Sequence, residues 1–432
     1  SQGRLEALLN FQTMVAGLTA MDIANASLLD EATAAAEAMI MMFNSRSRDK
    51  VKAGANLFLV DDFVFRQTRD VLITRAAPLG IDIQFVDYKL IEADPRLFGV
   101  IVQYPAACGE VRDYRKLVEE VHGAGALVGV GADLMSLTLL TPPGEWGADI
   151  VFGSNQRFGL PMSYGGPHAG FFATRDEMKR NMPGRLIGVS IDAHGNLALR
   201  MALQTREQHI KRERATSNIC TAQALLATMS GMYAQYHGPE GLKRIARHIF
   251  SMACTLAGAL NKLGYTIKHE QFFDTVCVQA IPGITSEMIE KIALRRGINL
   301  WYPCANCVLI STDEVTTLKE INEIVAIFAE AAGKKAEEVT SLCDCFCIDE
   351  KFQRKSAFLE EHNFNSYHSE TDLMRYIKML ERKDFSLANG MIPLGSCTMK
   401  LNSAVSMYAM SWPEFGNIHP FVPADQAEGY HK

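Results

Sequence analysis

A polar, glycine-rich turn between two apolar runs is the part of the sequence best suited to hold a small molecule. The runs ADIVFGS (148–154) and GFFA (170–173) are typical of buried strands. The turn between them begins with Asn155, Gln156 and Arg157, and its glycines allow the backbone to approach a ligand closely. The pattern predicts a pocket whose chemistry depends on the residues of this turn.

Enzymes that use pyridoxal 5'-phosphate (PLP) place a lysine in such a turn, and its amine forms an imine with the cofactor. This sequence has Arg157 there instead. A guanidinium stays protonated under ordinary conditions and is a very poor imine nucleophile. We therefore expect a cofactor pocket that has lost its reactive residue, and we assign no catalytic residue to this chain.

Composition excludes several classes of protein. The 432 residues carry a formal net charge of -6, which does not favour nucleic-acid binding. No apolar run reaches the roughly 18 residues that a membrane span requires, and nothing resembles a secretion signal. We expect a protein of the bacterial cytoplasm or the mitochondrial matrix with no nucleic-acid or membrane partner, truncated at both ends.

The cysteines could suggest metal or redox chemistry. Cys304 and Cys307 form a CxxC pair without nearby histidines, and the tight CxCxC spacing of Cys343, Cys345 and Cys347 suits few tetrahedral sites. We predict no metal at either motif and leave their roles open. The remaining cysteines in apolar surroundings are interpreted as small buried residues of a reducing compartment. These are Cys108, Cys220, Cys254 and Cys277.

Helical and strand patterns alternate through the first half of the chain, which predicts an α/β fold with a large, mostly parallel, helix-covered sheet. From about residue 240 the pattern changes to that of a smaller α+β domain. The predicted divisions are a large domain 1–235, a small domain 236–333, a linker 334–366 and the opening of a further domain 367–432. The predicted helices are 4–19, 29–43, 67–78, 112–124, 286–297, 317–332 and 370–383, and the predicted strands are 55–60, 81–86, 97–104, 126–133, 148–153, 170–173 and 274–281.

Long segments of the chain resemble the P-protein of the glycine cleavage system, glycine decarboxylase. The resemblance covers almost the whole sequence. It is carried by SQGRLEALLNFQ (1–12), GADIVFGSNQRFGLPMSYGGPHAGFFA (147–173), MPGRLIGVSIDAHGN (182–196), MALQTREQHIKRERATSNICTAQALLA (201–227), PLGSCTMKLN (393–402) and WPEFGNIHPFVPADQAEGY (412–430).

The resemblance implies a fold of the aspartate-aminotransferase type (PLP-dependent transferase fold type I). The family's long form is a tandem pair of such folds, and only its second half carries the catalytic lysine. This chain resembles the first half plus the start of the second. The intact protein would decarboxylate glycine with PLP, pass the aminomethyl group to lipoylated H-protein, and form a homodimer. This part would be scaffold and active-site wall.

The same resemblance locates the expected pocket residues. Asp133 stands where related folds pair an aspartate with the pyridinium nitrogen, although it could equally cap a helix at a strand end. The helix that would hold the phosphate begins here with Asp30 and Glu31, and both carboxylates would repel a phosphate dianion. We therefore expect this half to bind no PLP. Phe65 and Arg66 replace a His-Pro of many relatives, so the role of that histidine is not carried over.

The loop PLGSCTMKLN is predicted to line the site of the catalytic half through Ser396, Cys397 and Thr398. The alternative is an ordinary turn that opens the next domain. Lys400 is a poor substitute for the missing lysine, because the domain that would complete its pocket lies beyond it. His168 and His368 are interpreted as structural residues.

The basic run 204–218 is interpreted as a solvated helix face or an interface, rather than as a phosphate clamp. We expect residues 367–432 to be poorly supported, because the natural partners of their apolar side chains lie in the missing half. Two alternatives stay open. One is a stand-alone non-catalytic binding or regulatory module of the same fold, and the other is an independent PLP enzyme of aminotransferase type.

Overall fold

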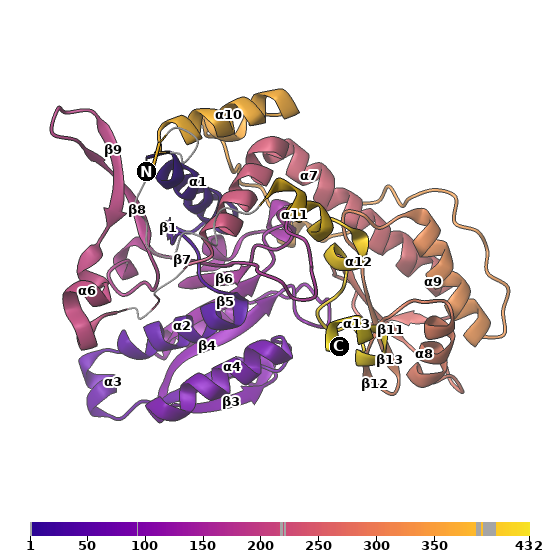
Figure 1. Ribbon diagram of the computed structural model, residues 1–432. Helices are drawn as coiled ribbons and strands as arrows, with labels where there is room; N and C mark the ends of the chain where they lie inside the picture. The colour runs from indigo at the N-terminus through magenta and orange to yellow at the C-terminus, as the bar shows by residue number, and fades with distance from the viewer. Residues whose placement is uncertain (1, 93, 217–218, 220–221, 386–389, 392–402) are drawn as a thin grey trace. The chain divides into compact units, whose positions relative to one another are not determined.

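The computed structural model describes residues 2–92, 94–216, 219, 222–385, 390–391 and 403–432 (Figure 1). The chain forms two compact units, each assembled from separate segments. The first unit comprises Ser1–Ser45, Asp149–Pro239 and Ala357–Lys432, and the second comprises Arg46–Ala148 and Glu240–Ser356.

The two units interleave along the chain, whereas the predicted domains follow one another in sequence. The predicted boundary at 235/236 lies close to Gly238, whose φ of 61° interrupts the long helix α7 (Ala224–Lys262) just before Pro239. Proline removes a backbone donor and cannot continue a regular helix, so the kink separates the two parts of α7. The four-part division of the chain stays a prediction.

The first unit contributes the neighbouring strands β1-β7-β6 of a seven-stranded sheet, and both of these pairs are antiparallel. Its β7 is buried along its whole length and lies against α2. A separate antiparallel hairpin is formed by β8 and β9. The elements are α1 (Gln2–Thr19), β1 (Ile23–Ala24), α2 (Glu31–Asn44), β6 (Ile150–Ser154), β7 (Gly170–Thr174), β8 (Leu186–Ile191), β9 (Leu197–Ala202), α6 (Gln208–Lys211), α10 (Glu370–Arg382), α11 (Ala404–Met410), α12 (Pro413–Gly416) and α13 (Glu428–His431).

The second unit contains parallel strands in the order β5-β4-β2-β3, connected by helices as a βαβ pattern requires. All eight residues of β4 are buried, which explains why its sequence is apolar except at Gln103. The elements of this part are α3 (Arg48–Lys52), β2 (Leu57–Asp61), α4 (Arg66–Ala76), β3 (Asp82–Val86), β4 (Leu97–Tyr104), α5 (Arg115–Gly123) and β5 (Leu127–Ala132).

The same unit carries an antiparallel sheet of order β10-β11-β13-β12, with α8 and α9 beside it (Figure 1). Thr317 caps α9, and Glu320 returns the bond in a capping box, so the sequence itself marks where this helix begins. The elements are β10 (Thr266–Ile267), β11 (Thr275–Gln279), α8 (Ser286–Arg295), β12 (Trp301–Cys304), β13 (Cys307–Ser311) and α9 (Leu318–Ala331).

The expectation that residues 367–432 are poorly supported is wrong for α10, which lies along α1 (Figure 1). Tyr376 is buried, and its hydroxyl accepts a hydrogen bond of 2.7 Å from Asn10 Nδ2. Leu380 packs with Ala7 in the same cluster. Tyr376 and Leu380 are the buried residues of this amphipathic helix, and α1 supplies their apolar partner.

Three further findings bear on the predictions. Cys304 and Cys307 are joined by a disulfide across the β12–β13 hairpin. Cys108 and Cys277 are free and buried, Cys254 is free and half-buried, and Cys220 lies outside the described residues. None of the helices in the described part of the chain is long and apolar enough to cross a membrane.

Candidate functional site

The turn after β6, where a PLP enzyme would carry its lysine, is fixed by Asn155. Its side chain is fully buried and donates from Nδ2 to Ser230 Oγ at 2.6 Å and to the Leu226 carbonyl at 3.5 Å. Its Oδ1 accepts the Ala169 N–H at 3.1 Å, and its own N–H donates to the Ala169 carbonyl at 3.0 Å. Asn155 thus joins the turn to α7 and to the residue that precedes β7.

Arg157 is half-buried in the turn that follows. The Phe158 N–H closes that turn by donating to the Asn155 carbonyl at 3.0 Å, and the Phe158 ring packs edge-on against Tyr233 at a centroid distance of 5.6 Å. The backbone at Arg157 is therefore held on both sides. The sequence from 155 to 169 contains no lysine, so the turn has no amine that could form an imine.

The N-terminus of α2 meets the same start of β7. Asp30 caps the helix, with Oδ1 accepting the Thr33 N–H at 2.6 Å. Leu28 and Gly170 exchange two backbone hydrogen bonds of 2.8 and 3.1 Å, and a Cβ on Gly170 would lie 2.4 Å from the Asp30 carbonyl oxygen. Ala169 and Gly170, which are consecutive, therefore hold the turn of Asn155 and the start of α2 side by side.

The first unit does not fit PLP. A phosphate at the N-terminus of α2 would meet the carboxylate of Asp30, which already occupies a backbone donor there, and Glu31 adds a second carboxylate in the first turn. With Arg157 in the turn beside it, the pocket lacks both the amine and the anion site that this cofactor needs.

The C-terminal segment covers the second part of the turn. Ser163 donates its N–H to the Gly416 carbonyl at 2.9 Å, and Tyr164 donates to the Ile418 carbonyl at 2.8 Å. The Tyr164 ring packs on Tyr430 at a centroid distance of 4.6 Å. These contacts support part of the segment after residue 367, although Met407, Trp412 and Phe421, on which the expectation of poor support rested, are exposed.

The other predicted site residues are dispersed. Asp133 lies in the second unit, where its Oδ1 accepts the Met135 N–H at 3.0 Å and its carbonyl accepts the Ser136 hydroxyl at 2.8 Å. These are local turn bonds, and the short helix that follows begins after Met135 without a side-chain cap, so the capping role also stays a prediction. The pairing of Asp133 with a pyridinium nitrogen stays a prediction. Four residues of the loop 393–402 that carried predictions lie outside the described residues: Ser396, Cys397, Thr398 and Lys400.

The two histidines make local contacts within the first unit. His168 Nδ1 lies 3.3 Å from the Gly166 carbonyl oxygen. His368 Nδ1 lies 2.9 Å from the Tyr236 carbonyl oxygen, and a Cβ on Gly238 would lie 2.6 Å from the His368 ring. These contacts suit the structural roles expected for both residues.

Arg206, in the basic run 204–218, is a buried structural residue. Its guanidinium donates to the carbonyls of Met182 and Gly184, the latter at 3.1 Å. The Pro183 carbonyl between them accepts Asn25 Nδ2 at 3.1 Å, so Arg206 supports the loop that leads towards α2. Burial lowers the pKa of Arg206. Nη1 and Nη2 are used on backbone carbonyls, whereas Nε is buried without a hydrogen-bond partner among the described residues, so the side chain serves the local backbone rather than a phosphate at the surface.

A cluster of buried charges in the second unit escaped the sequence analysis. Arg112 Nη1 donates to Asp61 Oδ2 at 2.9 Å, and Nε donates to Glu110 Oε2 at 2.6 Å. The guanidinium also lies 4.4 Å from the Phe63 ring centroid and 4.8 Å from that of Tyr88. The signal that could have found it is positional, because Asp61 ends β2 and Glu110 and Arg112 follow β4, at the same edge of a parallel sheet.

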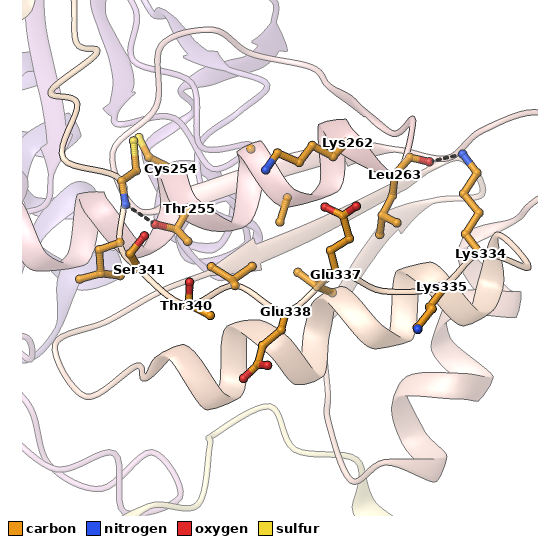
Figure 2. Close-up of a pocket in the computed structure, with 16 residues that line it drawn as sticks. Cys254, Thr255, Lys262, Leu263, Lys334, Lys335, Glu337, Glu338, Thr340 and Ser341 are labelled. Atoms are coloured by element: carbon orange, nitrogen blue, oxygen red, sulfur yellow. Dashed lines mark hydrogen bonds between the residues drawn. The ribbon is translucent and has the colours of Figure 1, made fainter.

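A pocket between the second half of α7 and the predicted linker is a weaker candidate (Figure 2). Its lining mixes Lys262 and Lys335 with Glu337, so it selects no sign of charge. The Cys343 N–H donates to Thr255 Oγ1 at 2.8 Å and fastens the linker to the helix. Burial, with the nearby cysteines of the CxCxC motif, raises the pKa of Cys254 to about 12.

The fold is that of the PLP-dependent transferases. A solved aspartate aminotransferase of subgroup IV from Thermus thermophilus aligns with 77% of this chain and 91% of its own chain at a TM-score of 0.52, with 14% sequence identity. The family model of the glycine cleavage system P-protein matches residues 1–328. The chain therefore belongs to the glycine cleavage system P-protein family.

The similarity to that family extends beyond the matched region. Proteins named glycine dehydrogenase (decarboxylating) from Bacteroides thetaiotaomicron and Flavobacterium johnsoniae are 56% and 54% identical to it over 432 and 430 residues. The chain spans about half of their length, namely 46% and 45%. A crystal structure of glycine decarboxylase (P-protein) in inhibitor-bound form aligns with 77% of this chain and 76% of its own at a TM-score of 0.70, with 34% identity.

Proposed function

We propose that this chain is the half of a glycine dehydrogenase (decarboxylating) that lacks the catalytic lysine. The observation that carries the proposal is the match of all its residues to 46% of a relative of that name, with Arg157 in the turn where the chemistry needs an amine. The other half would hold PLP and the catalytic lysine. The longer protein would take glycine as substrate and lipoylated H-protein as acceptor of the aminomethyl group, and would work as a homodimer in the bacterial cytoplasm.

In this proposal the chain supplies scaffold and one wall of the active site. Asn155, Asp30 and Arg206 use their polar atoms to hold the backbone of the pocket in place. Apolar side chains of the C-terminal segment remain exposed, and exposed apolar patches mark interaction surfaces. The exposed fractions are 96% for Met391, 52% for Met407, 54% for Trp412 and 70% for Phe421.

Activity measurements test the proposal. The purified chain with PLP, glycine and lipoylated H-protein should release no CO₂ above the rate of free PLP. Addition of a separately expressed catalytic half should restore release, and Trp412→Ala should weaken that restoration, since the exposed indole would lie at the junction. CO₂ release by the chain alone would contradict the assignment of the active site to the other half.

The same reagents separate the alternatives. A stand-alone binding or regulatory module would not associate with the catalytic half in size-exclusion chromatography. An independent PLP enzyme would trap the cofactor on one of its own lysines after borohydride reduction, and peptide mapping would identify that lysine. Neither result is expected, because the chain is similar to its relatives over its whole length and lacks an amine in the pocket turn.

A further inference from the structure

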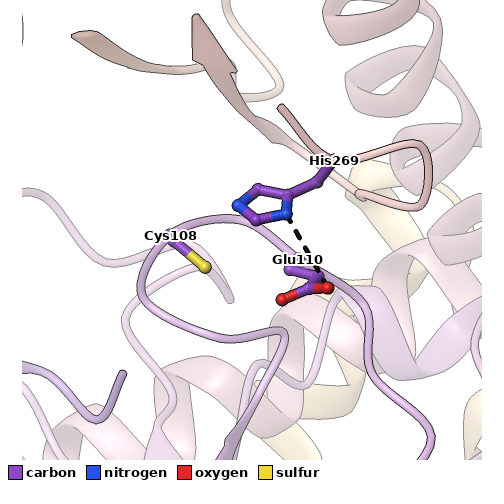
Figure 3. Close-up of side chains that lie close together, drawn as sticks. All are labelled: Cys108, Glu110 and His269. Atoms are coloured by element: carbon purple, nitrogen blue, oxygen red, sulfur yellow. Dashed lines mark ion pairs between the residues drawn. The ribbon is translucent and has the colours of Figure 1, made fainter. Parts of the chain in front are cut away.

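Three side chains of the second unit bring a thiol, a carboxylate and an imidazole together. One ligand atom each from Cys108, Glu110 and His269 lies within 4.8 Å of the other two. Cys108 and Glu110 come from the loop after β4, and His269 comes from the segment between β10 and β11. Figure 3 shows the three side chains turned towards one another. Cys108 is buried, and the other two are half-buried.

The backbone holds these two segments together independently of the three side chains. The Val111 N–H donates to the Gln271 carbonyl at 2.8 Å. Gly109, with a φ of 88°, lies so close to the other segment that a Cβ there would sit 2.2 Å from the Thr275 carbonyl oxygen. Only glycine fits such a contact with a positive φ. The cluster is therefore pre-organised by main-chain contacts on both sides of it.

The cluster retains atoms that can act as ligands. His269 Nε2 is buried and has no hydrogen-bond partner among the residues that the structure describes. Arg112 Nε donates a hydrogen bond to Glu110 Oε2 at 2.6 Å. The other carboxylate oxygen, Glu110 Oε1, lies 3.7 Å from His269 Nδ1, which is beyond hydrogen-bonding distance. Cys108 Sγ lies 3.8 Å from Arg112 Nη2. A buried ring nitrogen without a partner is uncommon and calls for a ligand.

We propose that Cys108, Glu110 and His269 bind a divalent transition-metal ion, with Zn²⁺ as the best match. Zinc accepts sulfur, nitrogen and oxygen ligands, whereas Mg²⁺ and Ca²⁺ prefer oxygen alone. Bond lengths of about 2.0–2.3 Å in a tetrahedral site place neighbouring ligand atoms roughly 3.5 Å apart. Ligand atoms that now lie within 4.8 Å of one another need to approach by at most about 1.3 Å to reach that separation.

The surrounding charges allow a cation beside Arg112. Asp61 and Glu110 both bind this guanidinium, so the buried set carries one more carboxylate than cation. Lys89 and Lys268 are exposed, where solvent screens their charge. The bound ion would join the loop after β4 to the segment before β11 and so stabilise the second unit. The inference is independent of the proposed function, because no residue of the PLP-type pocket takes part.

A cobalt titration tests the site. We would use the purified chain with Cys343→Ser, Cys345→Ser and Cys347→Ser, so that the CxCxC motif cannot contribute, and with the Cys304–Cys307 disulfide kept oxidised. Co²⁺ should bind at one equivalent with thiolate-to-cobalt absorption in the near ultraviolet, and Zn²⁺ should displace it. Loss of an outer-shell partner costs about 10–100-fold in metal affinity, so loss of a ligand in Cys108→Ser or His269→Gln should cost at least about 100-fold.

Matched variants make the test decisive. Cys277→Ser removes a buried thiol from the same apolar cluster as Cys108 and should leave binding unchanged. Glu110→Gln keeps the shape of the ligand but removes its charge, and should weaken binding. Circular dichroism would confirm that each variant is folded. If Cys108→Ser does not fold, His269→Gln tests the loss of a ligand in its place. Absence of a one-equivalent complex would overturn the proposal, and so would binding that survives both ligand variants or is lost equally in Cys277→Ser.

Discussion

A sequence motif usually marks the place where a protein does its chemistry. Two regions of this chain differ from that expectation: the turn around Asn155 in the first unit and the charged cluster around Arg112 in the second unit. The turn lies in the most strongly patterned part of the sequence, yet the polar atoms of Asn155 and Asp30 are used on the protein itself. The cluster lies at the end of β2 and in the loop after β4, without a recognised motif. There, Asp61, Glu110 and Arg112 form ion pairs away from solvent.

This difference shows what the two kinds of signal report. A long family motif records how the backbone is folded, and that fold persists after the reactive residue is replaced. Buried ionisable groups report instead where the chain sustains charges in a medium that penalises them. Burial by itself would lower the pKa of Arg112, but Tyr114, Asp61 and Glu110 together raise it above its usual value. The charged state of Arg112 thus depends on its partners.

The largest expected effect comes from breaking the buried pair. Asp61→Ala should lower the free energy of unfolding by about 3 kcal/mol, because removal of one partner leaves Arg112 buried with Glu110 alone. Urea-induced unfolding measures this. The neighbouring Asp62, which pairs with Arg69 at 3.7 Å in an exposed position, is the matched control, and Asp62→Ala should cost about 0–1 kcal/mol. Equal losses in the two variants would mean that the buried cluster adds no special stability.

A smaller loss is expected at the turn of the first unit. Asn155→Ala should lower the free energy of unfolding by about 2 kcal/mol, since Ser230 Oγ and the Ala169 N–H lose a partner within the protein. Gln156→Ala is the control, because the Gln156 side-chain amide makes one solvent-exposed hydrogen bond of 3.3 Å to the Pro161 carbonyl. This substitution should lower the free energy of unfolding by less than about 0.5 kcal/mol. An unchanged free energy of unfolding in Asn155→Ala would contradict the difference between the two regions, since the polar atoms of the turn would then be available to a ligand.

Much of the fold could be predicted from periodicity. The predicted helix 317–332 is α9 at Leu318–Ala331, and the predicted helix 370–383 is α10 at Glu370–Arg382. The hairpin β8–β9 was missed, although the alternation in LIGVSI and LALRMA flanks a turn that contains Gly195 with a φ of 83°.

The site was predictable only where its residues are close in sequence. The absence of a lysine near Arg157 follows from the sequence alone, and the acidic start of α2 does too. The cluster of Asp61, Arg112 and His269 joins positions that are far apart along the chain, so no local pattern marks it. The interleaving of the two units was missed for the same reason, because it depends on long-range contacts.

A modest effect is expected where α10 rests on α1. Tyr376→Phe should lower the free energy of unfolding by about 1 kcal/mol, because the hydroxyl accepts from Asn10 Nδ2 at 2.7 Å and from Gln235 Nε2 at 3.3 Å. Tyr408→Phe in α11 is the control, since that side chain is 65% exposed and its loss of a hydroxyl should be neutral. If both variants unfold like the parent chain, α10 is not a cooperative part of the first unit and is poorly supported by α1.

The smallest expected effect concerns restoration of the cofactor pocket. Arg157→Lys supplies an amine but leaves Asp30 and Glu31 at the N-terminus of α2. Repulsion between unit charges about 4 Å apart is worth roughly 1 kcal/mol in water and about 4 kcal/mol at an effective dielectric near 20, and solvent screening reduces it. We therefore expect no tight PLP binding by Arg157→Lys alone. Absorbance titration with PLP measures this.

The triple variant Arg157→Lys, Asp30→Ser, Glu31→Gly should bind PLP several-fold more tightly than Arg157→Lys, because serine still caps α2 while both negative charges are gone. Arg157→Lys with Asp49→Ser is the control, since it removes an exposed carboxylate from the first turn of α3 in the other unit and should gain nothing. Tight, saturable binding by the single variant would show that the carboxylates do not guard a phosphate site. Arg157 would then be the one residue that separates the first unit from a working cofactor pocket. The difference between this unit and the charged cluster of the second unit would depend on that single side chain.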